Sequence, residues 1–383
     1  MANNNENKIL NVPNLRFPEF TGEWKAERLN DIAILTKGAG ISKDQLSESG
    51  EPCILYGELY TKYKSEIIED VISKTNIPTD KLIKSKANDV LIPCSGETAV
   101  DIATARCVSS DNVLLGGDLN IIRLKHHDGS FMSYQLNGKR KYDIAKVAQG
   151  VSVVHLYGEH LKGIVTYNPQ IEEQKKIVGL LSLLDERIAT QNKIIEKLQS
   201  LIKGIAQHCI KESTSGNTYV KLGDICQITT GKLDANAQVD NGIYPFFTCA
   251  EQPFKIDSFA FDTEALLISG NGANLGYINY YKGKFNAYQR TYVLDLFSEN
   301  IQYIKWALKV LLPKRIAIEK SSSNTPYIVL STLTDLRLPI PCKSKQSFIA
   351  NLMQSLERKL SNQIAQYDSY NYLKQYLLRQ MFI

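Results

Sequence analysis

The stretch from Gln170 to Ile210 reads QIEEQKKIVGLLSLLDERIATQNKIIEKLQSLIKGIAQHCI and decides how the chain is built. Its apolar residues recur at alternating spacings of four and three, which is the heptad pattern of a helix that pairs with another helix. The stretch contains no proline and only two glycines, so it predicts one helix about 60 Å long, a spacer and not a core helix. The apolar positions are Ile177, Leu181, Leu184, Ile188, Ile195, Leu198, Ile202, Ile205 and Cys209.

The same pattern returns between Ser347 and Ile383, displaced by 172 residues. Gln363 falls on Gln191 as a polar interruption of the seam, and Lys374 is a second interruption. A proline precedes each helix, so the two segments are predicted to be copies in one register. The repeated apolar positions are Ile349, Met353, Leu356, Leu360, Tyr367, Tyr370, Leu377 and Met381, and Pro341 and Gln346 fall on Pro169 and Gln174.

A heptad seam needs a partner, and the economical partner for each long helix is the other one. Antiparallel pairing would put the two globular regions at opposite ends, and Gln191 and Gln363 could then meet and fix the register. The positions expected at this interface are Ile177, Leu184, Ile188, Ile195, Leu356 and Leu360. The alternative is that each long helix packs separately on its own globular region.

Two globular regions carry matching landmarks. The opening Leu-x-Asp-Ile of 28–38 recurs in 221–231, and each copy ends in a glycine that releases the chain into a polar loop. Buried strands then lead into a Ser-Gly turn, at 89–96 and again at 264–270, and further strands follow at 118–124 and 288–294. The first copy carries about twenty extra residues, within 43–86, as expected when a framework is kept and its loops change.

The predicted fold class is α/β, with two repeated globular domains separated by two long helices that pair as an antiparallel coiled coil. Helices are also expected at 130–148 and 300–318. The predicted domains are an N-terminal arm at 1–23, a first globular domain at 24–168, a central long helix at 169–212, a second globular domain at 213–340 and a C-terminal long helix at 341–383.

The composition predicts a cytoplasmic protein with a mildly basic surface. The chain has 383 residues, a formal net charge of +5 and no apolar run near 18 residues, and its start is polar. Its seven cysteines form no C-x-x-C pair, so neither a disulfide framework nor a zinc site is expected. The basic charge is compatible with a nucleic-acid partner but does not require one.

The sequence contains no complete catalytic motif. The glycine-rich 270–276 lacks the Lys-Ser/Thr of a phosphate loop, and Asn168-Pro169 lacks the second proline and the aromatic residue of an amino-methyltransferase motif. The five histidines do not sit at metal-ligand spacings or beside a nucleophile motif. No catalytic residue and no metal ligand is therefore predicted.

The duplicated order of these features resembles the specificity subunit of type I restriction-modification systems. The resemblance covers nearly the whole chain and is strongest at 12–24 and at Pro169-Gln-Ile-Glu-Glu-Gln174; the second copy departs from it at 344–346, where it reads Ser-Lys-Gln. The resemblance implies a non-catalytic, sequence-specific DNA-binding subunit whose two target recognition domains each read one half of a split target in double-stranded DNA. The helices would set the spacing and dock two methyltransferase subunits. Restriction and translocase subunits would complete the complex, and S-adenosylmethionine, ATP and magnesium would belong to these partners.

DNA contacts are expected from polar loops flanked by lysine and arginine, because phosphate contacts position a protein and base contacts specify a sequence. In the first region the candidates are Lys37, Lys43, Thr98, Gln149 and Ser152. In the second they are Lys232, Asn271, Asn274, Gln289, Arg290, Thr291, Ser322 and Asn324, with the tyrosines and lysines of 277–284 beside them.

Two other functions remain open at this point. A coiled-coil adaptor that binds only proteins would retain no specific DNA even beside a methyltransferase. A stand-alone enzyme with a fused recognition domain would transfer methyl groups by itself, but no motif in the sequence supports it.

Overall fold

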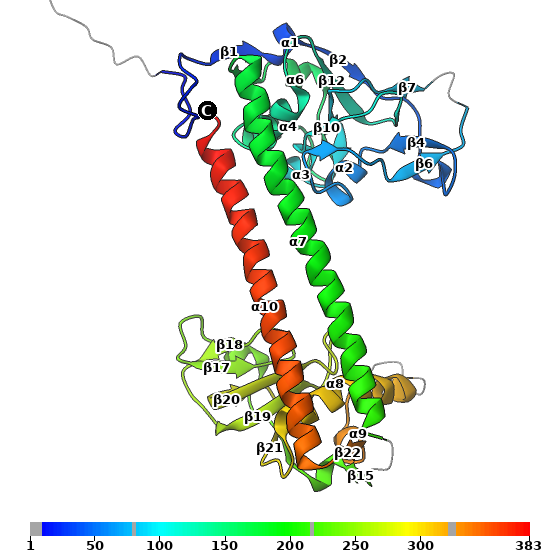
Figure 1. Cartoon of the computed structure of the whole chain (residues 1–383), viewed down its shortest axis with the longest axis vertical. Coiled ribbons are helices and arrows are strands. Elements are labelled where there is room, and N and C mark those ends of the chain that lie inside the picture. Colours follow the sequence, from blue (N-terminus) through cyan, green and yellow to red (C-terminus); the bar gives the residue numbers. More distant parts are fainter. Residues whose placement is uncertain (1–9, 79–81, 215–217, 321–326) are drawn as a thin grey trace, which may run out of the picture. The chain divides into compact units, whose positions relative to one another are not determined.

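A computed structural model describes residues 10–78, 82–214, 218–320 and 327–383 (Figure 1). The chain divides into two compact units, unit 1 with Met1–Asn192 and Gln366–Ile383, and unit 2 with Lys193–Ala365. Each unit combines one globular region with part of helix α7 (Ile171–Glu212) and part of helix α10 (Lys343–Gln380). The predicted α/β class with two long helices is confirmed.

The main sheet of unit 1 has five strands in the order β2-β12-β8-β10-β5. All of its neighbours are antiparallel except β10 and β5, which run parallel. Its central strand is buried at every position, which explains the continuous apolar run seen in the sequence. The strands are β2 (Ala33–Lys37), β5 (Ile67–Ile68), β8 (Asp89–Pro93), β10 (Arg106–Val108) and β12 (Leu119–Leu124).

A second sheet in unit 1 is built mostly from the segment that the first copy has in addition. It has five short strands in the order β3-β6-β4-β11-β7, and the described part of unit 2 has no counterpart of it. The strands are β3 (Leu46–Ser47), β4 (Glu51–Ile54), β6 (Ser73–Thr75), β7 (Ile83–Lys84) and β11 (Leu114–Leu115).

The sheet of unit 2 repeats the main sheet of unit 1. Its order is β16-β21-β19-β20-β17-β18, again antiparallel except for one parallel pair, β17 with β20, at the place that β5 and β10 occupy in unit 1. The duplication seen in the sequence is thus a duplication of topology. The strands are β16 (Gln227–Thr230), β17 (Tyr244–Phe247), β18 (Phe254–Ile256), β19 (Phe261–Ser269), β20 (Ile278–Ala287) and β21 (Thr291–Asp295).

Short two-stranded pairs close each globular region at the start of a long helix. Strand β1 pairs with β14 in unit 1, and β15 pairs with β22 in unit 2. A third pair, β9 with β13, lies in unit 1. Their bounds are β1 (Lys25–Arg28), β9 (Ser95–Gly96), β13 (Val154–His155), β14 (Val165–Asn168), β15 (Thr218–Lys221) and β22 (Arg337–Ile340).

The helix expected over 130–148 is two helices, α4 (Gly129–Asn137) and α5 (Lys141–Lys146), because the chain leaves the helical path at Gly138. The helix expected over 300–318 is confirmed as α8 (Ile301–Lys320). Each Leu-x-Asp motif forms a short helical turn, α1 in unit 1 and η2 in unit 2. The remaining short helices are α1 (Leu29–Ile32), η1 (Lys43–Gln45), α2 (Glu58–Thr61), α3 (Ala99–Ile102), α6 (Gly158–Lys162), η2 (Leu222–Asp224), η3 (Ala235–Ala237) and α9 (Leu330–Thr334).

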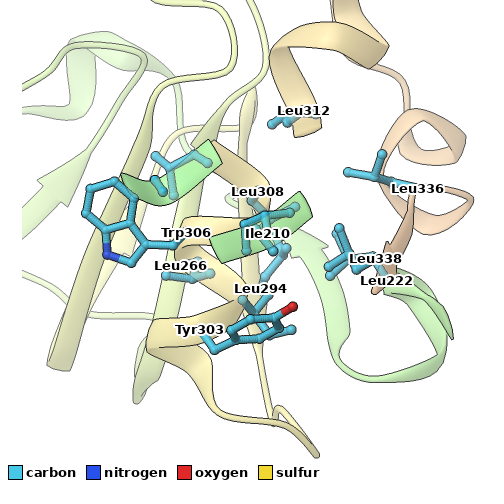
Figure 2. Packing of buried hydrophobic residues seen from close by; sticks show 14 of the residues in the cluster. Ile210, Leu222, Leu266, Leu294, Tyr303, Trp306, Leu308, Leu312, Leu336 and Leu338 are labelled. Atoms are coloured by element: carbon cyan, nitrogen blue, oxygen red, sulfur yellow. The ribbon is translucent and has the colours of Figure 1, made fainter. Parts of the chain in front are cut away.

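The core of unit 2 forms around α8 (Figure 2). Tyr303 and Leu308 of this helix are fully buried, and the Tyr303 hydroxyl donates to the carbonyl of Pro339 at 2.6 Å, which removes the cost of burying it. Residues of both long helices enter the same cluster, so the end of α7 and the beginning of α10 are part of this core. The helix residues concerned are Leu198, Ile202, Ala206, Ile210, Ile349 and Met353.

An aromatic cluster in unit 1 holds the other parts of the two long helices. Trp24, Phe131 and Phe382 pack together with ring centroids 5.2 to 6.4 Å apart. Ile177 and Leu181 from the beginning of α7 and Leu377 and Met381 from the end of α10 complete the cluster.

The two long helices are therefore antiparallel partners, since in each unit the earlier part of one packs with the later part of the other. The alternative in which each helix packs only on its own globular region is wrong. Among the predicted interface positions, Ile177, Leu184 and Ile195 are buried, and Ile188, Leu356 and Leu360 are half-buried. Gln191 is buried and Gln363 half-buried.

A buried charge cluster ties α10 to α7 and to the globular region of unit 1. The Lys374 ammonium lies 2.5 Å from Glu66 and 2.6 Å from Asp185, and the Tyr134 hydroxyl donates to Asp185 at 2.7 Å. Burial lowers the pKa of Lys374, but the two carboxylates outweigh it, so the net shift is upward. The polar interruption at Lys374 is thus a fully paired buried cation.

The described part of the N-terminal arm lies on the same unit. Arg16 makes a two-pronged bond to the buried Glu173 at 2.7 Å, and the Leu15 amide donates to the carbonyl of Gln380. Within the described ranges, no helix combines the length and apolar composition that crossing a bilayer requires.

Candidate nucleic-acid interface

Four loops gather at one edge of the sheet in unit 2, at 231–233, 248–250, 270–276 and 288–290. We call this the unit 2 loop surface. The Gln289 amide donates to the carbonyl of Leu233 at 2.9 Å, and the Gly270 amide donates to that of Arg290 at 2.9 Å. The Asn274 side chain donates to the carbonyl of Cys249 at 3.0 Å. These bonds hold loops that are far apart in sequence as one surface.

A glycine begins the corresponding loop in both units because another backbone segment passes too close for a side chain. A Cβ at Gly231 would lie 1.9 Å from the carbonyl oxygen of Ala287. A Cβ at Gly38 would lie 2.0 Å from the carbonyl oxygen of Gly116. The glycine that the sequence repeats is therefore a steric requirement of the fold.

The predicted residues of unit 2 divide by exposure. Lys232, Gln289 and Arg290 are exposed on the loop surface, and Asn271 and Asn274 are half-buried. Thr291 is 1% exposed, so its side chain is not available at the surface, and its amide instead donates within the turn to Tyr288. The remaining candidates, Ser322 and Asn324, lie outside the described residues.

The aromatic and basic side chains of 277–284 do not form one patch beside these loops. Tyr280 donates to Glu264 at 2.6 Å and Lys282 lies 3.7 Å from the same carboxylate. Tyr281 points to the opposite face, where its ring packs against Phe247. Alternation along the strand separates these residues.

In unit 1 the loops after Gly38, around 95–98 and at 149–157 also meet, and we call them the unit 1 loop surface. Strand β9 pairs with β13, and Gln149 and His155 exchange backbone hydrogen bonds at 2.8 and 2.7 Å. Ser95 donates to the carboxylate of Asp118 at 3.2 Å. Three loops predicted separately from the sequence are thus neighbours in space.

A small stack of side chains covers this meeting point. The Lys37 ammonium lies 5.7 Å from the centre of the Tyr157 ring, and His155 stacks on Tyr157 with centroids 6.1 Å apart. Gln149 and Ser152 are exposed beside the stack.

Two further predicted residues of unit 1 have other settings. Thr98 is exposed, but its hydroxyl oxygen accepts the Asp101 amide at 3.1 Å as the N-cap of α3, which accounts for it structurally. Lys43 is exposed at the rim of a groove of about 780 Å³ lined also by Tyr56, Lys62 and Asp118.

The cations of both loop surfaces are available to an anionic ligand. Lys37, Lys232 and Arg290 have no carboxylate within 4 Å in the part of the chain that the structure describes. Such cations neutralise phosphates without first breaking an internal ion pair. In contrast, the described residues contain no group of three histidine, cysteine or acidic side chains arranged to hold a metal ion.

Two parts of the chain, 21–200 and 214–367, match the family model described as the type I restriction modification DNA specificity domain. The chain belongs to this specificity family. The resemblance seen in the sequence is thereby confirmed, and each match includes one of the two globular regions.

Individual relatives agree with the family. The specificity subunit of the type I restriction enzyme EcoDI from Escherichia coli is 44% identical over 137 residues, which cover 36% of this chain and 30% of that protein. The MjaVIII specificity subunit from Methanocaldococcus jannaschii is 24% identical over 403 aligned residues, which cover 92% of this chain and 89% of that protein.

Solved structures share the fold. The S subunit of a type I restriction-modification system from M. genitalium aligns with a TM-score of 0.66 at 20% identity, over 97% of this chain and 99% of that one. A chain from a structure titled for complex assembly and conformational transition of the type I R-M system aligns with a TM-score of 0.58 at 16% identity, over 95% of this chain and 98% of that one.

In this member of the specificity family, the unit 1 loop surface also carries an apolar feature that the sequence patterns did not predict. Val151 is 98% exposed at the tip of the 149–155 turn, with Val153 and Tyr157 about half exposed beside it. DNA contacts were expected from polar loops flanked by basic residues, and that criterion does not include valine. An apolar side chain flanked by Gln149 and Ser152 was the available signal.

Proposed function

We propose that the chain reads a bipartite target in double-stranded DNA, with each loop surface contacting one half, and performs no catalysis itself. The observation that carries this proposal is the duplicated construction of the two surfaces. In both units the loops gather around a strand-end glycine, and a lysine next to that glycine, Lys37 or Lys232, has no carboxylate partner in the described part of the chain. Membership of the specificity family supports DNA as the ligand.

Within each surface we assign different tasks to different residues. Lys37, Lys43 and Lys232 contact phosphates, because a lysine is a flexible point charge without base selectivity. Gln149, Gln289 and Arg290 contact base edges, where Arg pairs with guanine and Gln with adenine. Asn271, Asn274 and Ser152 supply further polar contacts. Ser322 and Asn324 are retained as candidates from the sequence.

We propose that the paired long helices set the distance between the two half-sites and that Gln191 and Gln363 fix their register. A polar residue in a heptad seam costs stability but selects one alignment of the helices. Replacing both glutamines by leucine is expected to raise the free energy of unfolding and to blur the spacer length seen in methylated targets. An unchanged, single spacer length would refute the register role.

The helices also offer a surface for methyltransferase subunits. Both carry large apolar side chains that remain exposed in the chain by itself, which is typical of an interface that a partner covers. These are Leu180, Leu183, Ile194 and Leu201 on α7 and Phe348, Ile364, Tyr372, Leu373 and Tyr376 on α10. The structure of a type I R-M complex assembly, which contains a chain with a similar fold, supports such association. We propose two methyltransferase subunits, joined by restriction and translocase subunits, in the cytoplasm.

On this proposal S-adenosylmethionine, ATP and magnesium bind to those partners and not to this chain. The decisive experiment exchanges residues 218–340 for the corresponding region of another family member and maps methylated positions in cells that carry the methyltransferase. One half of the target should change and the other should stay. A change in both halves, or methylation by the purified chain without partners, would contradict the proposal.

A further inference from the structure

We infer that the 149–155 turn of unit 1 reads the C5-methyl group of a thymine, with Val151 as the contacting residue. This inference rests on the proposed function and adds a specificity-determining residue to it. Val151 is 98% exposed, more than any other large apolar side chain in the described residues.

The exposure of Val151 comes from a well-defined turn. Gln149 and His155 close it with backbone hydrogen bonds in both directions, at 2.8 and 2.7 Å. Gly150 adopts a φ of +120°, and a Cβ there would lie 2.1 Å from the carbonyl oxygen of Val153. Only glycine fits such a conformation without strain, so the turn holds Val151 outward.

The base of the turn is anchored to the rest of unit 1. Val154 is buried and belongs to the pair β9 with β13, and Leu156 donates its amide to the carbonyl of Cys94 at 2.7 Å. Asn120, which is 1% exposed, donates its side-chain amide to the carbonyl of Leu156 at 2.9 Å. An anchored tip can deliver a methyl group to a fixed position, which a loose loop cannot.

The residues around Val151 favour DNA as the ligand that contacts it. The tip is continuous with the unit 1 loop surface, where Lys37 is available to a phosphate and Gln149 and Ser152 are exposed hydrogen-bonding groups. In the major groove, a thymine presents its C5-methyl group beside the O4 acceptor, and its paired adenine presents the donor and acceptor that a glutamine can bind together. An apolar tip next to a glutamine matches an A·T pair.

The test is a double-mutant cycle between protein and DNA, using the complex of the chain with its methyltransferase and the target found by methylation mapping. Each thymine of the target is replaced in turn by deoxyuridine, which lacks only the C5-methyl group. With the natural chain, one replacement should weaken binding about fourfold, as expected for one lost buried methyl. In Val151→Ala the natural duplex should bind about as weakly, and that replacement should have no further effect.

Two variants keep the test specific. Val151→Thr retains one methyl group and should give an intermediate loss. Val239→Ala removes the same atoms from an exposed valine of unit 2, 41% exposed, and should preserve the fourfold effect of the deoxyuridine. Because Val151 touches solvent on nearly all sides, its replacement should leave thermal unfolding unchanged.

Two results would overturn the inference. These are a target without thymine at its recognised positions, or deoxyuridine effects that are the same in the natural chain and in Val151→Ala. In either case specific retention of the target would leave the proposed function standing. Loss of all sequence-specific binding by the natural complex would reject the proposed function as well.

Discussion

The side-chain oxygen of Gln174 accepts the backbone N–H of Asp128 at 2.9 Å. The side-chain Nε2 of Gln174 donates to the carbonyl of Pro169 at 2.8 Å, so Gln174 joins the first turn of α7 to the N-cap of α4. Unit 2 repeats this arrangement, since Gln346 accepts from Asn300 at 3.0 Å and donates to Pro341 at 2.9 Å.

Both glutamines are 1% exposed, so losing either leaves buried backbone groups without partners. We expect Gln174→Ala to lower the free energy of unfolding by about 2 to 4 kcal/mol and to speed amide hydrogen exchange at the start of α4. The neighbouring Gln170 is exposed, and Gln170→Ala is expected to cost less than about 0.5 kcal/mol. Equal effects of the two substitutions would contradict the role of Gln174 in joining α7 to α4.

The contacts made by Gln174 in unit 1 and by Gln346 in unit 2 should lose stability at different pH values. His127 contacts Gln174, and burial lowers the pKa of His127 more than Glu27 raises it. Because the native state favours the neutral form of His127, the folded protein loses stability as the pH falls below 6.5, the ordinary pKa of histidine.

In unit 2 Glu299 contacts Gln346; burial raises the pKa of Glu299, but bonds from Lys343 and Gln346 outweigh it and lower the pKa below its usual 4.5. Its stabilising effect should persist until the pH falls below about 4.5. Protection factors for amide hydrogen exchange, which correct for the fall of the intrinsic exchange rate with pH, should therefore decrease from pH 7.5 to pH 5.5 at the start of α4 and not at the start of α8. His127→Gln should abolish the difference.

From the Lys374 cluster we expect a variant whose loss of stability becomes smaller at acidic pH. Lys374→Met leaves the buried carboxylates of Glu66 and Asp185 without their ion-pair partner, which typically costs about 3 to 5 kcal/mol. Burial already raises the pKa of Asp185, and stability linked to a raised carboxyl pKa grows as the pH falls. Denaturant unfolding should show a smaller deficit at pH 5 than at pH 8. Lys359→Met, an exposed lysine on the same helix, should show neither effect.

A strand-end glycine and a helical glycine predict opposite outcomes for the same substitution by alanine. Gly231→Ala places a methyl group 1.9 Å from a backbone oxygen and should destabilise unit 2 by several kcal/mol while disordering its loop surface. Gly179→Ala on α7 meets nothing within 4 Å and should stabilise the chain by about 1 kcal/mol. Thermal unfolding distinguishes the two directly. A tolerated Gly231→Ala would show that the close approach is not maintained.

Arg290 predicts a loss of sequence selectivity. If it pairs with a guanine, Arg290→Ala should weaken specific binding by about 10-fold to 100-fold, and Arg290→Lys should restore little because lysine lacks the two-pronged geometry. Arg337 is exposed on β22 of the same unit, and Arg337→Ala should leave the methylated motif unchanged. Full rescue by lysine would reassign Arg290 to a phosphate.

Much of the architecture could be predicted from local patterns. The heptad spacing from Ile177 to Cys209 predicted α7, and the apolar runs after Asp89 and Glu264 predicted the central strands β8 and β19. These features depend on neighbours along the chain, because a helix or buried strand repeats its exposure over a few residues. The break at Gly138 was missed because apolar spacing continues across it.

The sequence by itself determined the duplication, the two long helices and the family. Only the tertiary structure decided which side chains the loops present: it buried Thr291, used Thr98 as a helix cap and left Val151 outside. The reason is physical. A helix or strand is specified by contacts a few residues apart, whereas the exposure of a loop side chain depends on backbone segments that arrive from distant parts of the sequence, as Ala287 does beside Gly231.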